Sequence, residues 1–144
     1  MQTGKLINGI SNRLRRRSQV VQKRIGISGA QGNVLDYILV ESENHPVYQK
    51  EIEKEFGLRP PTATELLRTL EGKGLIVRVP EENDARYKRI VFQDKAAGIK
   101  DALRAEIEES EALLLRGISK EEKEIFLRVA QKMLENQLLP TLQC

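Results

Sequence analysis

The chain of 144 residues is long enough for one domain, or for one small domain with a dimerisation extension. Apolar residues make up 40% of it and can fill a core, whereas aromatic residues make up only 4% and tryptophan is absent. This composition argues against an enzyme pocket and against an RNA-binding surface that stacks bases on aromatic rings.

The net charge of +3 is unevenly distributed along the chain. Residues 1–35 contain seven Lys and Arg residues and no acid, whereas residues 94–144 contain ten acids and eight bases. Such an asymmetry indicates a polyanionic partner near the N-terminal half.

The cysteine and hydropathy patterns predict where the protein resides. The single cysteine, Cys144, cannot form an internal disulfide, which fits a reducing compartment. No apolar run reaches signal-peptide length or the roughly 18 residues of a membrane span. We therefore expect a soluble, cytoplasmic protein that makes no use of a membrane.

Residues 4–25 are predicted to form the first helix. Its apolar side chains fall roughly on one side, at Leu6, Ile7, Ile10, Leu14, Val21 and Ile25. The run Arg15-Arg16-Arg17 interrupts this stripe, so the helix would be marginal alone. It must dock within the chain or across a dimer.

The second predicted helix begins after Ser28, which has Gln31 three residues later in the spacing of a capping box. Its expected buried face consists of Ala30, Val34, Leu35, Ile38 and Leu39. The helix fades over residues 41–44 and His45-Pro46 breaks it. Val47 is a candidate for a one- or two-residue strand that adds to the wing described next.

Residues 51–92 form the segment around which the chain is organised. A helix over residues 51–56 ends at Gly57, and a second runs from Pro60-Pro61 to Gly72. The second helix has apolar side chains at Ala63, Leu66, Leu67 and Leu70. Its opposite face is polar and suits base edges and phosphates, with Thr62, Thr64, Glu65, Arg68 and Thr69.

Two short β-branched runs, residues 75–79 and 90–92, follow that helix and flank a charged hairpin tip over residues 80–89. The predicted fold is therefore mainly α with a small β-wing: a winged helix-turn-helix with N- and C-terminal dimerisation helices.

Two further helices are predicted after the wing. Asp94 is expected to cap a long helix to about Leu115, and Ser119 with Glu122 forms a second capping box. The apolar positions of the long helix are Ala96, Ile99, Leu103, Ile107 and Leu114. Those of the last helix are Ile125, Phe126, Val129, Met133 and Leu134, before it frays through Leu138, Leu139 and Pro140.

The predicted organisation has three parts. Residues 1–45 contribute to dimerisation and to the core of the module, residues 46–92 form the winged helix-turn-helix, and residues 93–144 form C-terminal dimerisation helices. The terminal helices carry more apolar surface than a module of this size can cover, which favours a homodimer. A two-fold dimer also suits a palindromic DNA site.

The order of elements resembles the MarR family of winged-helix transcriptional regulators over nearly the whole chain. The most specific matches are Leu70-Glu71-Gly72-Lys73-Gly74-Leu75-Ile76-Val77-Arg78, which leads from the recognition helix into the wing, and the wing motif Asp84-Ala85-Arg86. The resemblance implies a homodimer that binds a palindromic operator in double-stranded DNA, usually as a repressor. It also implies release by a small-molecule inducer bound near the junction of dimer and DNA-binding module, or by cysteine oxidation.

The chain departs from the family pattern at three places. Arg59-Pro60-Pro61 stands where a Ser or Thr commonly begins the recognition helix, and Phe92-Gln93 replaces the usual Leu-Thr before the long helix. Glu65 occupies the position of a common basic residue, where it either accepts from a cytosine amino group or repels phosphate.

The candidate DNA-binding residues each have an ordinary alternative. Thr62, Thr64 and Arg68 are expected to contact the major groove rather than only solvent. Arg86 either enters a minor groove or forms a surface salt bridge with Asp84 or Glu82. Lys88 and Arg89 serve as phosphate contacts or as one solvated strand face, and their opposite directions in a strand allow only one to face a groove squarely.

Other polar groups carry weaker indications. The cluster Arg13, Arg15, Arg16 and Arg17 could touch DNA flanks or a membrane surface, or form a solvated face. Tyr48 is interpreted as packing or a turn filler. His45 lacks a second ligand for a metal, and nothing beside Cys144 activates its thiol for oxidant sensing.

No catalytic constellation is recognisable, because the one histidine stands alone and no phosphate loop, HExxH or paired CxxC is present. We therefore predict a protein that is not an enzyme and needs no cofactor or metal. It is predicted to be a homodimeric DNA-binding transcriptional regulator; the alternative is a winged-helix module that uses the same face for a protein partner.

Overall fold

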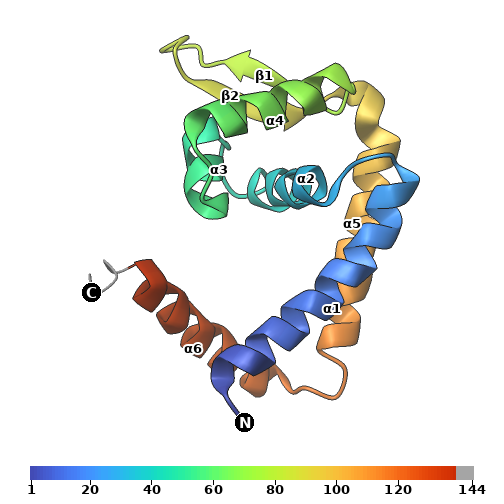
Figure 1. Ribbon diagram of the computed structural model, residues 1–144, viewed down its shortest axis with the longest axis vertical. Helices are drawn as coiled ribbons and strands as arrows, with labels where there is room; N and C mark the ends of the chain where they lie inside the picture. Colours follow the sequence, from blue (N-terminus) through green and yellow to red (C-terminus); the bar gives the residue numbers. More distant parts are fainter. Residues whose placement is uncertain (139–144) are drawn as a thin grey trace. The chain divides into compact units, whose positions relative to one another are not determined.

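The computed structural model describes residues 1–138, and its elements follow the predicted order (Figure 1). The elements are α1 (Thr3–Arg24), α2 (Gly29–Glu41), α3 (Gln49–Phe56), α4 (Pro60–Gly72), β1 (Ile76–Pro80), β2 (Lys88–Phe92), the 3₁₀ turn η1 (Asp94–Ala96), α5 (Ala97–Leu114) and α6 (Lys120–Leu138). The fold is mainly helical with a two-stranded antiparallel wing, as predicted. Cys144, Leu139 and Pro140 lie outside the described residues.

The chain divides into two compact units. The first, residues 1–108, contains α1 to α4, both strands and most of α5. The second begins at residue 109 and contains the end of α5 and α6. No helix within residues 1–138 is both long enough and apolar enough to cross a membrane.

One hydrophobic core holds the winged part of the first unit together. Leu35 and Ile38 of α2, Ile52 of α3 and Leu67 of α4 are completely buried in it. These residues recur at helical spacing, so each helix turns one apolar face inward. The other buried members are Ile27, Val34, Leu39, Val47, Leu70, Leu75, Ile76, Ile90, Ala96 and Leu103.

Ala30 is an exception to the predicted buried face of α2. The capping box that starts the helix is present, with the Gln31 N–H donating to Ser28 Oγ and the Ser28 N–H donating to Gln31 Oε1, both at 3.3 Å. Ala30 is nevertheless exposed and lines a shallow hollow beside Pro61 and Thr62 of α4. It lies in the first turn of α2, before the stretch that enters the core.

The wing is a single antiparallel pair, in which Ile76 faces Phe92 and Pro80 faces Lys88. The strand proposed at Val47 is wrong, although the Val47 carbonyl accepts one hydrogen bond from the Ile90 N–H at 2.8 Å. Before Val47, Pro46 has no N–H to donate to a strand partner. After it, α3 begins only two residues later. Val47 therefore anchors β2 without becoming a strand.

The start of α5 also differs from the prediction, because Asp94 does not cap it. Asp94 is the first residue of η1, and the residue before it, Gln93, bonds to β1 instead. The Gln93 N–H donates to the Leu75 carbonyl at 3.0 Å and Gln93 Nε2 donates to the Ile76 carbonyl at 2.7 Å. These bonds tie the entry of α5 to the wing.

The start of α6 follows the prediction. The Glu122 N–H donates to Ser119 Oγ at 3.1 Å, and the Ser119 N–H donates to Glu122 Oε1 at 2.9 Å. The hydrogen bond from the Ser119 backbone holds the pKa of Glu122 below its usual value. All the apolar positions predicted for this helix, from Ile125 to Leu134, are exposed.

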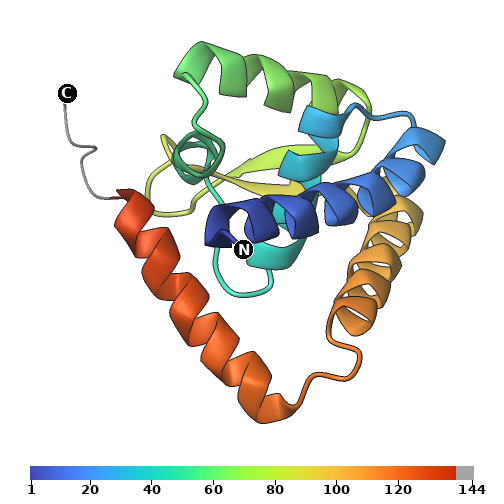
Figure 2. The same ribbon diagram turned by 60° about the horizontal axis from the view of Figure 1, so that its bottom comes forward.

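Within the first unit, α1 meets α2 and α5 through a polar junction near its C-terminal end (Figure 2). Gln22 of α1 is only 2% exposed and lies flat against Gly32 of α2. Asp36 of α2 has its pKa raised to about 6, first by burial and then by the negative charge of Glu106 of α5. Glu106 in turn lies 3.7 Å from Arg17 of α1 and accepts a hydrogen bond from Ser18.

The Gln22–Gly32 contact leads to a stability prediction. A Cβ at residue 32 would lie 2.1 Å from Cδ of Gln22, which is only 2% exposed, so the buried amide must shift within the junction. We expect Gly32→Ala to lower the free energy of unfolding by about 1–3 kcal/mol in chemical denaturation, as overpacking does. In the control Gly29→Ala nothing lies within 4 Å of the new methyl group, and helix propensity should raise stability by up to about 1 kcal/mol. Equal effects of the two substitutions would contradict this account of the junction.

Candidate nucleic-acid interface

Helix α4 carries the polar face that the sequence singles out. Ala63, Leu67 and Leu70 are completely buried, which sets the rotation of the helix about its axis. Thr62, Glu65 and Arg68 are consequently exposed on the outer side. Arg59 is the N-cap and provides no side-chain hydrogen bond, so Pro60 and Pro61, with their preset φ angles, begin the helix.

Thr64 differs from its neighbours, because it is half-buried and its hydroxyl is engaged by α3. Gln49 Nε2 donates to Thr64 Oγ1 at 2.9 Å and to Glu53 Oε2 at 3.0 Å. Sequence reasoning did not single out Gln49. Its contact with Thr64 joins two helices, and the spacing of residues within either helix does not predict such a contact.

Two side chains on the outer face of α4 form an ion pair. Arg68 Nη1 lies 3.4 Å from Glu65 Oε2, and about two thirds of each side chain is exposed. The Thr69 hydroxyl donates to the Glu65 carbonyl at 3.0 Å and so turns back to its own helix. Glu65 thus partly neutralises the only arginine within α4, and water screens the pair.

The wing tip is organised by Asp84. It accepts hydrogen bonds from the Arg86 guanidinium at 2.8 and 3.0 Å and from the Arg86 N–H at 3.1 Å. The hydrogen bonds from Arg86 hold the pKa of Asp84 below its usual value. The Arg86 side chain remains 86% exposed, so the salt bridge with Asp84 exists without removing the guanidinium from solvent.

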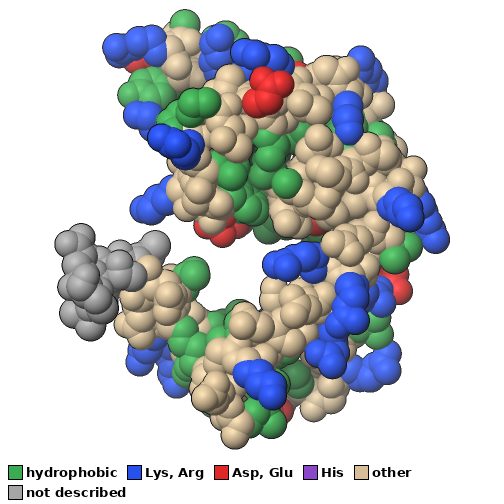
Figure 3. Space-filling model, in the orientation of Figure 1, with side chains coloured by type: hydrophobic (Ala, Val, Ile, Leu, Met, Phe, Trp, Pro, Cys, Tyr) green, Lys and Arg blue, Asp and Glu red, His purple; other side chains and the backbone are tan. Residues whose placement is uncertain are grey.

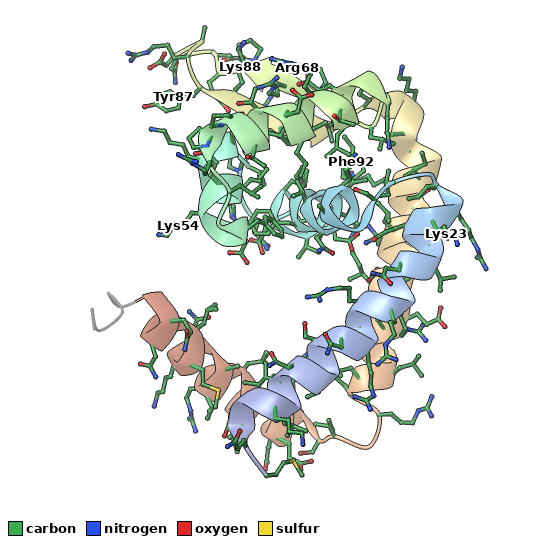
Figure 4. All side chains as sticks on the ribbon, in the orientation of Figure 1. Lys23, Lys54, Arg68, Tyr87, Lys88 and Phe92 are labelled. Carbon is green, nitrogen blue, oxygen red and sulfur yellow. The ribbon has the colours of Figure 1, made fainter. Side chains whose placement is uncertain are left out.

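Lys88 and Arg89 open β2 and are both exposed, whereas Ile90 next to them is buried. Figure 3 shows Lys and Arg side chains along the outer edge of the winged part, with acidic side chains between them. In Figure 4, Arg68 and Lys88 extend from this edge, whereas Phe92 points inward from β2. The structure therefore brings candidates from α4 and from the wing to one edge of the first unit.

Tyr48 has a larger part in the wing than the packing or filler interpretation gave it. Its hydroxyl donates to Glu81 Oε1 at 2.9 Å, and its ring meets the edge of the Tyr87 ring at a centroid distance of 6.3 Å. The hydrogen bond to Glu81 raises the pKa of Tyr48. These contacts bound a surface hollow of about 980 Å³ between the start of α3 and the wing.

The remaining polar candidates lie elsewhere. His45 Nε2 pairs with Glu41 at 3.1 Å, and a hydrogen bond with the Pro46 carbonyl is the first cause of its raised pKa. Within residues 1–138 no group of three or more His, Cys, Asp or Glu side chains could hold a metal ion. Arg13 turns back to the Gly9 carbonyl of α1 at 3.1 Å.

Comparisons with known proteins agree with this geometry. A family model described as the MarR family matches residues 25–86, which include α2, α3, α4 and β1. The structure of the transcription regulator MarR from Oenococcus oeni PSU-1 is 27% identical, with a TM-score of 0.77 over 93% of this chain and 99% of that one.

Two structures of MepR from S. aureus are also 27% identical. MepR in a DNA-binding conformation has a TM-score of 0.83, with 95% of this chain and 99% of that chain covered. The MepR–DNA complex has a TM-score of 0.72, with 94% and 98% covered.

The bond between Tyr48 and Glu81 leads to a prediction for the wing. Tyr48→Phe removes it, so we expect amide hydrogen exchange over residues 82–88 to accelerate by about fivefold, the factor that corresponds to a hydrogen bond of about 1 kcal/mol. Tyr37→Phe is the matched control, because Tyr37 donates to Glu51 Oε2 at 2.7 Å outside the wing. Unchanged exchange in Tyr48→Phe, or equal acceleration in both variants, would show that this bond does not order the wing.

Proposed function

Because this chain belongs to the MarR family of DNA-binding transcriptional regulators, we propose that it is a homodimeric repressor that reads a palindromic operator. The observation that carries the proposal is α4, whose inner face is fully buried while Thr62, Glu65 and Arg68 project outward. A helix held in this way by its module can enter a major groove with its polar side chains foremost.

The wing supplies the second contact. Arg86 is held at its tip by an exposed ion pair, which is worth only about 0–1 kcal/mol. Arg86 can therefore leave Asp84 at little cost in free energy and enter a narrow minor groove, where the negative potential of DNA is concentrated. Lys88 and Arg89 follow in β2, where both are exposed and one of them can face a phosphate. The similar MepR protein forms a complex with DNA, which supports DNA as the partner.

Dimerisation would be the role of the terminal segments, residues 1–45 and 93–144. Leu6 and Ile7 of α1 are about half exposed, as are Ile125, Phe126 and Leu134 of α6. Apolar side chains in such numbers are covered most economically by a second copy of the same helices. A two-fold axis would then present two α4 helices to two half-sites.

Regulation would act on the spacing of the two α4 helices. A small-molecule inducer relieves repression only if it binds the low-affinity arrangement more tightly than the DNA-bound one. Without an inducer, the dimer bound at its operator excludes other proteins from that stretch of DNA.

Selection of bound fragments from random duplex DNA tests the proposal, together with the oligomeric state of the free protein. We expect a dimer and a palindrome with half-site centres about 10 base pairs apart. The logarithm of the affinity should fall linearly with the logarithm of salt concentration, as phosphate contacts require. The proposal would be contradicted if the protein were a monomer and selected no DNA sequence. Binding to a partner whose affinity does not change with salt concentration would indicate a protein-interaction module instead.

Arg68→Ala tests whether α4 reads bases. We expect it to lose about 1–3 kcal/mol of operator binding and to relax specificity at one base pair per half-site. Fluorescence anisotropy on the selected operator and on random duplex measures both effects. Equal losses on the two DNAs would assign Arg68 to a phosphate instead of a base.

Arg86→Ala tests the wing. We expect operator binding to weaken by about 1 kcal/mol or more while the free energy of unfolding changes by only about 0–1 kcal/mol, because the Asp84 pair is exposed. Lys54→Ala is the matched control, since Lys54 is an exposed cation that Figure 4 shows on α3 away from the wing tip. If Arg86→Ala binds like the control in a gel-shift titration, the wing does not contact DNA through this residue.

A further inference from the structure

The contact between Gln49 and Thr64 joins the two helices of the helix-turn-helix through one amide group. Gln49 Nε2 lies 2.9 Å from Thr64 Oγ1, 3.0 Å from Glu53 Oε2 and 3.5 Å from the Pro60 carbonyl oxygen. Gln49 is in the first turn of α3, whereas Pro60 and Thr64 lie in the first two turns of α4.

The partners of this amide determine which way round it sits. The Glu53 carboxylate and the Pro60 carbonyl have no hydrogen to donate, so the amide nitrogen of Gln49 must face them. That nitrogen has two hydrogens, and its two short contacts are with Glu53 and Thr64. Thr64 Oγ1 is consequently the acceptor in its bond with Gln49.

A threonine hydroxyl that accepts still has its own hydrogen to donate. In a helix the usual recipient is the carbonyl four residues earlier, and Thr69 donates in this way to the Glu65 carbonyl at 3.0 Å. Among the hydrogen bonds of residues 1–138, none has the Thr64 hydroxyl as donor, and the Pro60 carbonyl four residues earlier receives the long contact from Gln49. Thr64 can therefore donate outward.

From this arrangement we propose that Gln49 is a positioning residue for DNA recognition, which makes the Thr64 hydroxyl a hydrogen-bond donor toward an acceptor atom on the DNA. The proposal rests on the proposed function and deepens it. Thr64 lies one helical turn before Arg68, so both belong to one side of α4. Suitable acceptors are phosphate oxygens, purine N7, guanine O6 and thymine O4, whereas the cytosine amino group is excluded because it only donates.

The coupling between the two residues can be measured with a double-mutant cycle on the operator that the wild-type protein selects. The variants are Gln49→Met, which keeps the length of the side chain but removes its donor, Thr64→Val, and the two together. Each single variant should lose about 30-fold in affinity, since a dimer carries two copies of a contact worth roughly 1 kcal/mol each. The double variant should bind no more weakly than Thr64→Val alone, because both substitutions remove the same interaction.

Two controls separate positioning from ordinary packing. Thr64→Ser keeps the hydroxyl, so Gln49→Met should retain its full loss in that background. Gln49→Met combined with Arg68→Ala should show the product of the two separate losses, since Arg68 pairs with Glu65 and not with Gln49. Chemical denaturation of each variant shows whether the fold is intact, and Gln49→Ala replaces Gln49→Met if the latter does not fold.

Selections repeated with Gln49→Met and Thr64→Val identify the acceptor. Loss of preference at the same base pair in both variants assigns a base atom, whereas equal losses on all duplexes assign a phosphate. The inference would be overturned, while the proposed function stands, by either of two results. Gln49→Met could bind the operator with wild-type affinity, or the fold-loss of affinity in the double variant could equal the product of the losses of Gln49→Met and Thr64→Val. Failure of the wild-type protein to select any operator would instead refute the proposed function.

Discussion

One face of α4 is buried, and this burial fixes the direction in which the helix presents its polar side chains. Ala63, Leu67 and Leu70 are sealed in a core that α2, α3 and the wing complete. Successive residues of a helix are rotated by a fixed angle, so the three buried positions decide which side chains face outward. Core packing is dense and tolerates little rotation, and the polar face therefore has a defined direction before any partner arrives.

Most of the fold could be predicted because its signals are local. Apolar spacing marks the helices, and the capping boxes at Ser28 and Ser119 set two of their starts within a few residues of sequence. The expectations for Val47 and Asp94 were wrong for two different reasons. Pro46 and the start of α3 leave no room to extend the single bond between Val47 and Ile90 into a strand, whereas Gln93 reaches back to β1 before Asp94 can cap α5.

The candidate site was predictable to a smaller extent. The polar face of α4 follows from helical periodicity, so Thr62 and Arg68 could be placed on it from the sequence. Thr64 has the same pattern, yet it is half-buried and held by Gln49 from fifteen residues away. The helical spacing of residues in the sequence cannot predict such a contact, because the contact depends on the angle at which α3 and α4 meet. The bond from Tyr48 to Glu81 spans 33 residues and escapes sequence reasoning for the same reason.

Two carboxylates, one on α4 and one in the wing, each hold an arginine by an exposed ion pair that a DNA contact can replace. Glu65 and Asp84 pair with Arg68 and Arg86 in the free protein, and pairs as exposed as these are worth about 0–1 kcal/mol each. A correct contact of Arg68 with guanine would discriminate by about 1–3 kcal/mol, so the proposed operator could compete with Glu65 for this guanidinium. At a wrong base pair no such gain exists, and the arginine stays with its carboxylate. In the proposed complex Glu65 would thus raise the threshold for binding without preventing it, which would favour the cognate site over bulk DNA.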